Sequence, residues 1–331
     1  MKKIIIFGAT GNTGCYFVDY CAAHLNPDEY EIIAVGRKTT DFFNQHGIKY
    51  IQVDISNKED FLKLPKNDIY AVVNMAGLLP AYAHNPTVYD YTETNIIGGL
   101  NILEYARETA ADRTLYTQTR AELKGFFGKE EVLSPQMPRN IVFSGDHAFY
   151  TISKTLIVDT MEYYWREYGL KKFVFRLPNI YLYSPLTHYY IDGKKHLIAY
   201  RYMIERASKG EPLEMWGNPD VFKDVVYVKD LCQMMYKALF AKVDGGIYHV
   251  GTGVRTTLRE QIEGIIKVFS PKGNPSEIIS RPEKSGFLSF VMDIENAKKD
   301  LGYNPEYDYI SYLEDYKKER KLKRFDALWK S

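Results

Sequence analysis

The sequence is poor in cysteine, nearly balanced in charge and without long apolar runs, and each absence excludes a class of protein. Among its 331 residues, Cys15, Cys21 and Cys232 are too few and too scattered for a disulfide framework or a zinc site. A formal net charge of +1 gives no electrostatic reason to expect nucleic acid or a membrane surface as a partner. The apolar runs are too short to span a bilayer, and residues 4–7 are too few for the apolar core of a signal peptide. We therefore expect a cytoplasmic protein without a metal site.

What the sequence does contain is a glycine-rich turn directly behind an apolar run. Residues 4–7 (Ile-Ile-Ile-Phe) predict a buried parallel strand, and Gly8, Gly11 and Gly14 follow it. Gly8 permits a tight turn, Gly11 lets the backbone approach a pyrophosphate, and Gly14 lets a helix pack close to the strand. The helix N-terminus offers free N–H groups and the positive end of its dipole to phosphates. The pattern predicts a dinucleotide-binding site; the alternative is a glycine-rich turn that binds nothing.

Strands and helices alternate along the first half of the chain. We expect strands at residues 31–35, 48–53, 69–75, 113–119 and 173–177, and helices at 12–24, 87–109 and 150–168. This alternation predicts a doubly wound parallel sheet. Residues 125–149 contain Pro135 and Pro138 and break the pattern, so we expect a long loop or insertion there.

The periodicity changes after residue 180. We expect an irregular segment at 184–199, a helix at 200–209, and strands at 225–228 and 247–250 that return to the main sheet. The dinucleotide-binding domain then comprises residues 1–180 plus about 224–252, and a smaller mixed α/β substrate lobe comprises about 181–223 plus 253–331. Basic residues crowd the last fifteen positions, where a solvated helix is favoured over a site for an anionic partner.

Two positions bear on the adenosine half of a dinucleotide. Arg37 stands at the end of the second strand, where NAD-binding folds commonly carry an acidic residue. A guanidinium can pair with a 2′-phosphate that a carboxylate would repel, so Arg37 favours NADP over NAD; the alternative is a solvated basic turn. Asp54, at the end of the third strand, can accept a hydrogen bond from the adenine amino group or can cap a helix that begins near Ser56.

A tyrosine and a lysine four residues apart open the helix that follows the fifth strand. Tyr150 and Lys154 share one helix face, which can bring the ammonium near the phenol and a cofactor ribose. Proton transfer near neutral pH requires a lower phenol pKa than the ordinary value of about 10, and nearby positive charge provides it. The same spacing recurs at Tyr168 and at Tyr190, but only Tyr150 is placed at the carboxyl edge of the predicted sheet. The alternative is a surface pair without function.

A series of motifs in order along the chain carries a family resemblance. They are Gly8-x-x-Gly11-x-x-Gly14, Asp54, Val72-Val73-Asn74-Met75-Ala76, Asn95-Ile-Ile-Gly98-Gly-Leu-Asn101, Tyr150-x-x-x-Lys154, Arg176-Leu-Pro-Asn179-Ile-Tyr181, Lys223-Asp224-Val-Val-Tyr227-Val-x-Asp230, Tyr248-His249-Val250-Gly251 and Arg281-Pro282. Over nearly its whole length the chain resembles the extended short-chain dehydrogenases/reductases. Within them it resembles the NAD-dependent epimerase/dehydratase group, whose members act on nucleotide sugars. The resemblance implies a Rossmann-type fold.

The resemblance implies a role for each matching residue. Tyr150 is the expected general acid/base, Lys154 holds the nicotinamide ribose and depresses the phenol pKa, and a hydroxyl at the end of the fifth strand bonds the substrate oxygen. Thr119 fits that hydroxyl best, Thr117 is second, and Ser144 is a rival that lies only six residues before Tyr150. The expected cofactor-binding residues are Gly8, Thr10, Gly11, Asn12, Thr13, Gly14, Arg37, Asp54, Ile55, Ala76, Gly77, Asn95 and Lys154. The expected substrate-binding residues are Asn179, Lys223 and Arg281.

Several positions depart from the family pattern. Arg120 and Ala121 follow Thr119, where the family's 4,6-dehydratases place an Asp-Glu pair, so dehydration is disfavoured. Lys223 replaces a usual arginine and lacks its bidentate fork. His249 replaces a usual asparagine and reads best as a packed histidine. Arg281 can pair with a nucleotide diphosphate or form an ion pair between lobes.

The resulting hypothesis is an NAD(P)-dependent epimerase of a nucleotide sugar or similar polar sugar derivative. Its cofactor is NADP or NAD, with NADP favoured by Arg37. One alternative is an NADP-dependent reductase or dehydrogenase of a keto-sugar or other carbonyl compound, and another is a catalytically silent NAD(P)-sensing protein. The resemblance also implies a homodimer, formed through helices near residues 95–108 and 150–168.

Overall fold

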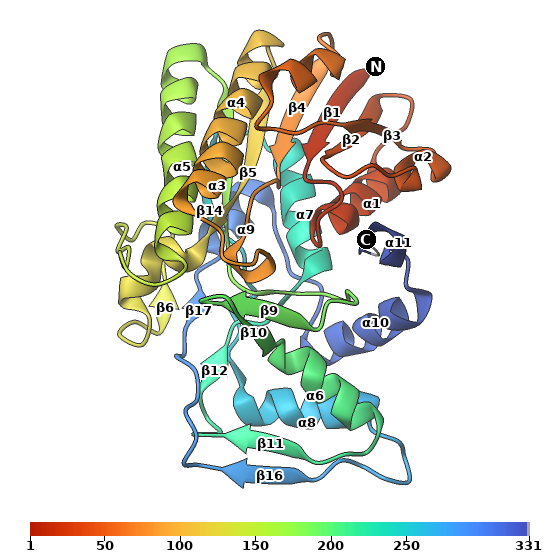
Figure 1. Cartoon of the computed structure of the whole chain (residues 1–331), viewed down its shortest axis with the longest axis vertical. Coiled ribbons are helices and arrows are strands. Elements are labelled where there is room, and N and C mark those ends of the chain that lie inside the picture. Colours follow the sequence, from red (N-terminus) through yellow and green to blue (C-terminus); the bar gives the residue numbers. More distant parts are fainter. Residues whose placement is uncertain (330–331) are drawn as a thin grey trace.

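The computed structural model describes residues 1–329, and a seven-stranded parallel sheet lies at its centre (Figure 1). In spatial order the strands are β14 (Gly245–His249), β7 (Lys171–Leu177), β5 (Arg113–Thr119), β4 (Ile69–Asn74), β1 (Lys2–Phe7), β2 (Tyr30–Gly36) and β3 (Lys49–Gln52). Every neighbouring pair runs parallel. The order reverses between β1 and β4, so the predicted doubly wound sheet is confirmed.

Alternate side chains of the strands fill two separate cores. Ile4 and Ile6 of β1 face one core, and Ile5 and Phe7 face the other. Helices α1 (Gly14–His24) and α7 (Val228–Leu239) cover the first face, and α4 (Gly98–Glu108) and α5 (Ala148–Tyr168) cover the second (Figure 1). Burial on both faces explains why the strands are continuous apolar runs rather than alternating ones.

The helix expected over 87–109 is divided into three segments. It consists of α3 (Val88–Tyr91), a π-helical turn (Thr92–Ile97) and α4. Thr87 and Asp90 form a capping box at the start, and each side chain bonds the other residue's backbone. Short π-helical turns place one residue out of the regular helical register and are frequent at functional sites. Here the turn contains Asn95, which is buried.

Two sequence-based expectations are wrong. Residues 184–199 are not irregular throughout, because β9 (His188–Ile191) and β10 (Lys194–Leu197) form a hairpin. Its two-residue turn, Asp192-Gly193, has positive φ at both positions, 47° and 71°. The dipeptide Asp-Gly favours such a turn and is a signal for a hairpin in the sequence. Residues 225–228 do not return to the main sheet: β13 (Val226–Tyr227) pairs with β8 (Ile180–Tyr181), since β14 occupies the edge beside β7.

The smaller lobe, predicted to bind substrate, lies below the carboxyl edge of the sheet in Figure 1. Its elements are α6 (Ala199–Ser208), α8 (Leu258–Phe269), the parallel pair β11 (Leu213–Trp216) and β16 (Ile278–Arg281), and the antiparallel pair β12 (Phe222–Lys223) and β15 (Thr256–Thr257). The predicted insertion contains β6 (Val132–Leu133), which pairs with β17 (Val291–Met292) and so ties the insertion to the C-terminal third of the chain. The remaining elements are α2 (Phe42–Gln45), α9 (Glu295–Leu301), and short 3-10 segments at Lys58–Lys63, Pro80–Tyr82 and Arg120–Phe126.

The basic C-terminal segment packs against the chain's own surface. Helices α10 (Tyr309–Leu322) and α11 (Asp326–Trp329) run back toward α1 (Figure 1). Arg320 pairs with Glu205 at 2.6 Å, and Arg324 pairs with Asp19 at 2.7 Å. These internal partners agree with the favoured interpretation of an ordinary helix, although Lys330 lies outside the described residues. No helix in residues 1–329 has the length and apolar character needed to cross a membrane.

Candidate active site

The glycine turn lies where the strand order reverses. Gly8 has a φ of +82°, and a Cβ on it would lie 2.6 Å from the backbone of Met75 and Ala76. A Cβ on Gly14 would lie 2.0 Å from the carbonyl oxygen of Gly8. Both positions therefore require glycine, because β1, β4 and the start of α1 meet there without room for a side chain.

The start of α1 is suited to a pyrophosphate. The backbone N–H groups of Asn12 and Thr13 donate to no backbone carbonyl within residues 1–329, whereas Gly11 N donates to Gly8 O at 2.9 Å. These amides and the helix dipole form an anion-binding arrangement at the carboxyl edge of β1. Thr10 lies beside it, against the end of β2 at Gly36. These are the residues that the sequence predicts to hold the pyrophosphate of a dinucleotide.

The two basic residues after β2 have different surroundings. Lys38 donates from Nζ to the carbonyl oxygen of Leu328 at 3.0 Å, so its charge helps to hold α11. Arg37 is exposed, and its guanidinium forms no ion pair within the described part of the chain. Of these two side chains, that of Arg37 is the better placed to pair with a 2′-phosphate on a ribose.

Asp54 and Ile55 follow β3. Asp54 Oδ1 accepts hydrogen bonds from the backbone N–H and the hydroxyl of Ser56, at 3.0 and 2.7 Å. Asn57, not Asp54, caps the 3-10 segment that follows. Ile55 packs against Gly98, where a Cβ would lie 2.6 Å from its side chain. Asp54 thus stabilises its own turn, and its second carboxylate oxygen is the one left for an adenine.

Lys154 and Asn95 border the loop after β4. Asn95 Oδ1 accepts from Leu78 N at 2.7 Å, and its Nδ2 donates to Ser153 Oγ at 3.0 Å, which holds this loop against α5. Lys154 Nζ lies 4.1 Å from the centre of the Tyr116 ring and close to Gly77. Burial lowers the pKa of Lys154 to about 7. Asn95 thus holds the loop after β4 in place, and its predicted contact with a cofactor stays a prediction. The Lys154 ammonium lies beside the open backbone of Gly77.

Tyr150 and Thr119 meet at the end of β5. The Thr119 hydroxyl lies close enough to the Tyr150 phenol to lower its pKa, against the larger effect of burial. Thr119 Oγ1 also accepts a hydrogen bond from Ala121 N at 3.1 Å, which leaves the hydroxyl proton free to be donated to the phenol oxygen. Burial raises the pKa of Tyr150, which is 8 % exposed. The geometry unites a phenol, a hydroxyl and a lysine on one sheet edge.

The two rival hydroxyls are placed differently. Thr117 Oγ1 donates to the carbonyl oxygen of Asn74 at 3.4 Å, so it is directed toward the neighbouring strand β4. Ser144 is exposed in a loop outside any strand, although the preceding apolar residues resemble a strand end. Only Thr119 is brought to Tyr150, while its role in chemistry stays a prediction.

A buried polar network underlies this edge. Arg176 of β7 donates from Nε to Glu122 at 2.5 Å, and both side chains are at most 2 % exposed. Arg176 also donates to His249 Nε2 at 2.6 Å, and His249 Nδ1–H donates to the carbonyl oxygen of Leu133 at 2.9 Å. Burial and the neighbouring guanidinium lower the pKa of His249 to about 3, so the ring is neutral. His249 is a packed histidine.

The predicted substrate-binding residues have different surroundings. Asn179 is exposed just after β7. Lys223 Nζ lies 3.8 Å from the centre of the Phe287 ring, in the segment where the lobe meets the sheet. Arg281 ends β16, at the far end of the lobe in Figure 1, and pairs with Glu214 of β11 at 3.2 Å. This is the ion-pair alternative for Arg281, formed within the lobe rather than between lobes.

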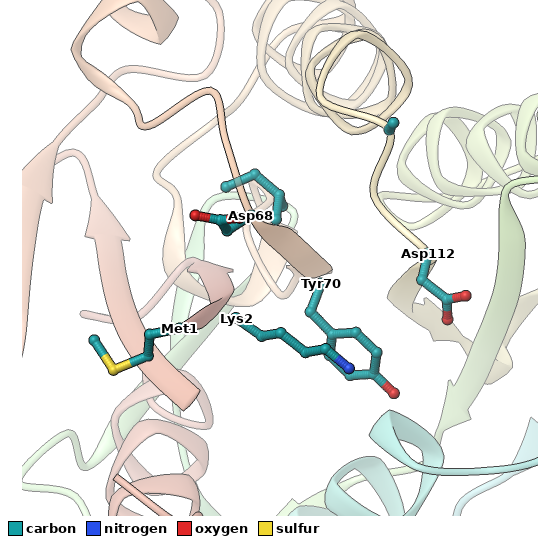
Figure 2. Close-up of a pocket in the computed structure, with 7 residues that line it drawn as sticks. Met1, Lys2, Asp68, Tyr70 and Asp112 are labelled. Atoms are coloured by element: carbon teal, nitrogen blue, oxygen red, sulfur yellow. The ribbon is translucent and has the colours of Figure 1, made fainter. Parts of the chain in front are cut away.

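A surface hollow of about 270 Å³ lies at the opposite, amino edge of the sheet (Figure 2). Met1 and Lys2 line it together with Asp68, Tyr70 and Asp112, and the Lys2 ammonium is 5.1 Å from the Tyr70 ring centre. In doubly wound sheets ligands bind at the carboxyl edge, where Thr119 and the glycine turn lie. We therefore place the active site at the carboxyl edge and not in this hollow.

Comparison with known proteins decides the family. The model of the NAD-dependent epimerase/dehydratase family matches residues 4–251, which include the glycine turn, Tyr150 and Lys154. The chain belongs to this family. The predicted relationship to the extended short-chain dehydrogenases/reductases is confirmed, and the chain is one of the family's enzymes by descent.

Individual relatives extend the comparison over nearly the whole chain. A proposed UDP-glucose 4-epimerase of Methanocaldococcus jannaschii is 24 % identical over 92 % of this chain and 94 % of its own. The UDP-glucose 4-epimerase of Thermotoga maritima, solved with UDP-glucose, has a TM-score of 0.76 at 21 % identity and covers 96 % of this chain and 99 % of its own. The UDP-glucose 4-epimerase of Thermus thermophilus, solved with NAD, has a TM-score of 0.71 at 21 % identity and covers 95 % and 98 %. Both solved structures share the fold of this chain.

Sequence reasoning missed two features of this family member. It treated Arg120 only as a missing acid, but the structure places its guanidinium over the Phe290 ring, 5.3 Å from the ring centre. It also did not identify Glu122 as buried. The signal for Glu122 was weak, because one carboxylate in a polar stretch predicts a solvated turn and its partner Arg176 is 54 residues away.

Replacing the buried lysine, Lys154→Met, should change how stability depends on pH. A folded-state pKa of about 7 lies below the roughly 10.4 of an unfolded lysine, so between these values the unfolded chain binds more protons. The contribution of Lys154 to the free energy of unfolding therefore rises with pH from about 7 to about 10. In the variant this rise should be absent, and the free energy of unfolding at pH 7.5 should increase by at least about 1 kcal/mol.

Urea unfolding of the cofactor-free protein across this pH range is the measurement. The same substitution at the exposed Lys194 of β10 serves as the control for loss of a surface charge. A pH slope in Lys154→Met equal to that of the unmodified protein would contradict the burial argument.

Proposed function

We propose that this protein is an NAD(P)-dependent epimerase that inverts a hydroxyl-bearing carbon of a nucleotide sugar. The observation that carries the proposal is the contact between the Thr119 hydroxyl and the Tyr150 phenol, one helical turn from the buried Lys154. Family membership and the UDP-glucose 4-epimerases among its relatives support the same reaction class.

Each side chain has a defined task in this reaction. Thr119 donates to the phenol oxygen or to the substrate oxygen and so aligns the two. Tyr150 takes the proton from the sugar hydroxyl and later returns it, while the charge of Lys154 stabilises the phenolate. Asn12 and Thr13 offer N–H groups to the cofactor pyrophosphate. A nicotinamide dinucleotide, when bound, supplies the acceptor and donor of hydride.

Epimerisation is favoured over dehydration by the residues after Thr119. Elimination of water from a sugar needs an acid and a base beside the reacting carbons. The chain has Arg120 and Ala121 there, and neither side chain can exchange a proton with substrate near neutral pH. A keto-sugar reductase remains the second candidate because Arg37 is exposed and without an ionic partner in residues 1–329, which suits NADP and net reduction.

Turnover without net oxidation is the first expected outcome. With UDP-glucose as a probe, chromatography should detect the C4 epimer while absorbance at the nicotinamide band stays constant. Tyr150→Phe should lower kcat by about 10²- to 10⁴-fold, because it removes the acid/base hydroxyl, and should leave dinucleotide binding intact.

The matched control is Tyr168→Phe, since Tyr168 has the same four-residue spacing to a lysine but lies at the exposed end of α5. It should turn over normally. A stoichiometric absorbance change with a carbonyl substrate would instead establish the reductase, and full activity in Tyr150→Phe would refute the assigned proton transfer.

We propose further that Arg37 gives a preference for NADP over NAD. Arg37→Asp should reverse the preference by about 10- to 100-fold, since a charge-assisted hydrogen bond to phosphate contributes about 1.5–3 kcal/mol. Calorimetric titration with each dinucleotide measures it. Lys38→Met is the control, because that ammonium is bonded to Leu328. Equal affinities for both dinucleotides in the unmodified protein would remove this proposal.

We also propose a homodimer formed through α4 and α5. Leu156 and Tyr163 lie seven residues apart on one face of α5 and are 43 % and 53 % exposed, as expected of a helix face that pairs with a second copy. Light scattering should give a mass near twice 38.4 kDa, and Leu156→Glu should shift it toward the monomer. A monomeric mass for the unmodified protein would exclude the dimer.

A further inference from the structure

Arg120 carries a positive charge on the segment that leaves β5. It directly follows Thr119, and its guanidinium lies over two aromatic rings, 5.5 Å from the centre of Phe127 and 5.3 Å from that of Phe290. These rings stack on each other at 4.6 Å. The aromatic faces shield the guanidinium from water and fix its direction, and burial lowers the pKa of Arg120 to about 10.

Lys223 brings a second positive charge to the same place. Its backbone forms a β-bridge with Phe290, whose ring contacts Arg120, and its Nζ lies 3.8 Å from the Phe287 ring centre. Burial lowers the pKa of Lys223 to about 8, and the charge of Arg120 adds to the effect. The two cations are therefore near neighbours that repel each other.

Neither cation has a carboxylate partner within residues 1–329. The adjacent Asp224 is occupied, because it accepts hydrogen bonds from the backbone N–H groups of Thr252, Gly253 and Met292. Two buried arginines are satisfied by the chain itself: Arg176 pairs with Glu122, and Arg201 donates to Ser184 Oγ and to the carbonyl oxygen of Leu182. Two half-buried like charges without a counterion raise the free energy of the folded chain, and a bound anion would relieve this cost.

We propose that Arg120 joins Lys223, which the family resemblance already implies as a substrate-binding residue, in one subsite that binds an oxyanion of the substrate. The proposal rests on the proposed function, and it adds Arg120 as a specificity-determining residue. Arg120 supplies the planar fork of donors that a lysine lacks, and Lys223 adds a point charge. The oxyanion is either the diphosphate that joins nucleoside and sugar or a carboxylate on the sugar, and both present the same paired oxygens.

The test compares three ligands by calorimetry in protein saturated with NAD, which blocks the glycine turn as a competing anion site. The ligands are inorganic pyrophosphate, UDP-glucose and UDP-glucuronate. If the diphosphate is bound, Arg120→Met and Lys223→Met should weaken all three by about 10- to 100-fold. If a sugar carboxylate is bound, the unmodified protein should prefer UDP-glucuronate, and the variants should lose that preference while pyrophosphate affinity is unchanged.

Arg120→Lys and Arg255→Met are the controls. The first keeps the charge and should restore part of the affinity, and the second removes a paired guanidinium over an aromatic ring and should change nothing. If Arg120→Met does not fold, Lys223→Met reports on the same subsite. Unchanged binding in both variants, or no binding of any ligand by the unmodified protein, would overturn the subsite.

These outcomes are separate from those of the proposed function. Binding that depends on Arg120 without epimerisation would retain the subsite and reject the epimerase. Epimerisation of a nucleotide sugar with an affinity indifferent to Arg120 would do the reverse.

Discussion

The ion pair between Arg176 and Glu122 is the interaction on which the active edge depends. It joins β7 to the segment that leaves β5, and through His249 and Leu133 it also holds β14 and the insertion. Removing one member of such a buried pair costs about 3–5 kcal/mol, because the other charge is left without a partner. Since Glu122 lies three residues after Thr119, this pair determines where the hydroxyl and the guanidinium of Arg120 emerge.

On this edge the pair Tyr150 and Lys154 is least charged when nothing is bound. Burial raises the pKa of Tyr150 and lowers that of Lys154, so both side chains are driven toward their neutral forms. Acid/base chemistry needs the opposite ionisation of each. A ligand that brings hydrogen-bond acceptors to the lysine and positive charge to the phenol reverses both shifts, which couples the reactive state to occupancy of the site.

Arg120 and Lys223 differ from Tyr150 and Lys154. They remain cationic, although their burial raises the free energy of the folded chain. The resemblance implies acidic residues at these positions in the family's sugar dehydratases, and this chain has Arg120 and Ala121 there. The proposed subsite gives that guanidinium a role in binding substrate, and it requires no change in the sheet, the glycine turn or the helix of Tyr150.

The sequence by itself determined the parallel sheet, the glycine turn and the helix of Tyr150, because each follows from local periodicity and from spacing within a few residues. It placed β5 at residues 113–119, as the structure has it, and ranked Thr119 above Thr117 and Ser144, the order that the contacts favour. Only the tertiary structure decided that Arg281 pairs with Glu214, that β13 stays outside the main sheet, and that Arg120 and Lys223 are neighbours. These facts depend on contacts between residues 46 to 170 positions apart, and such pairings are set by tertiary packing rather than by local sequence.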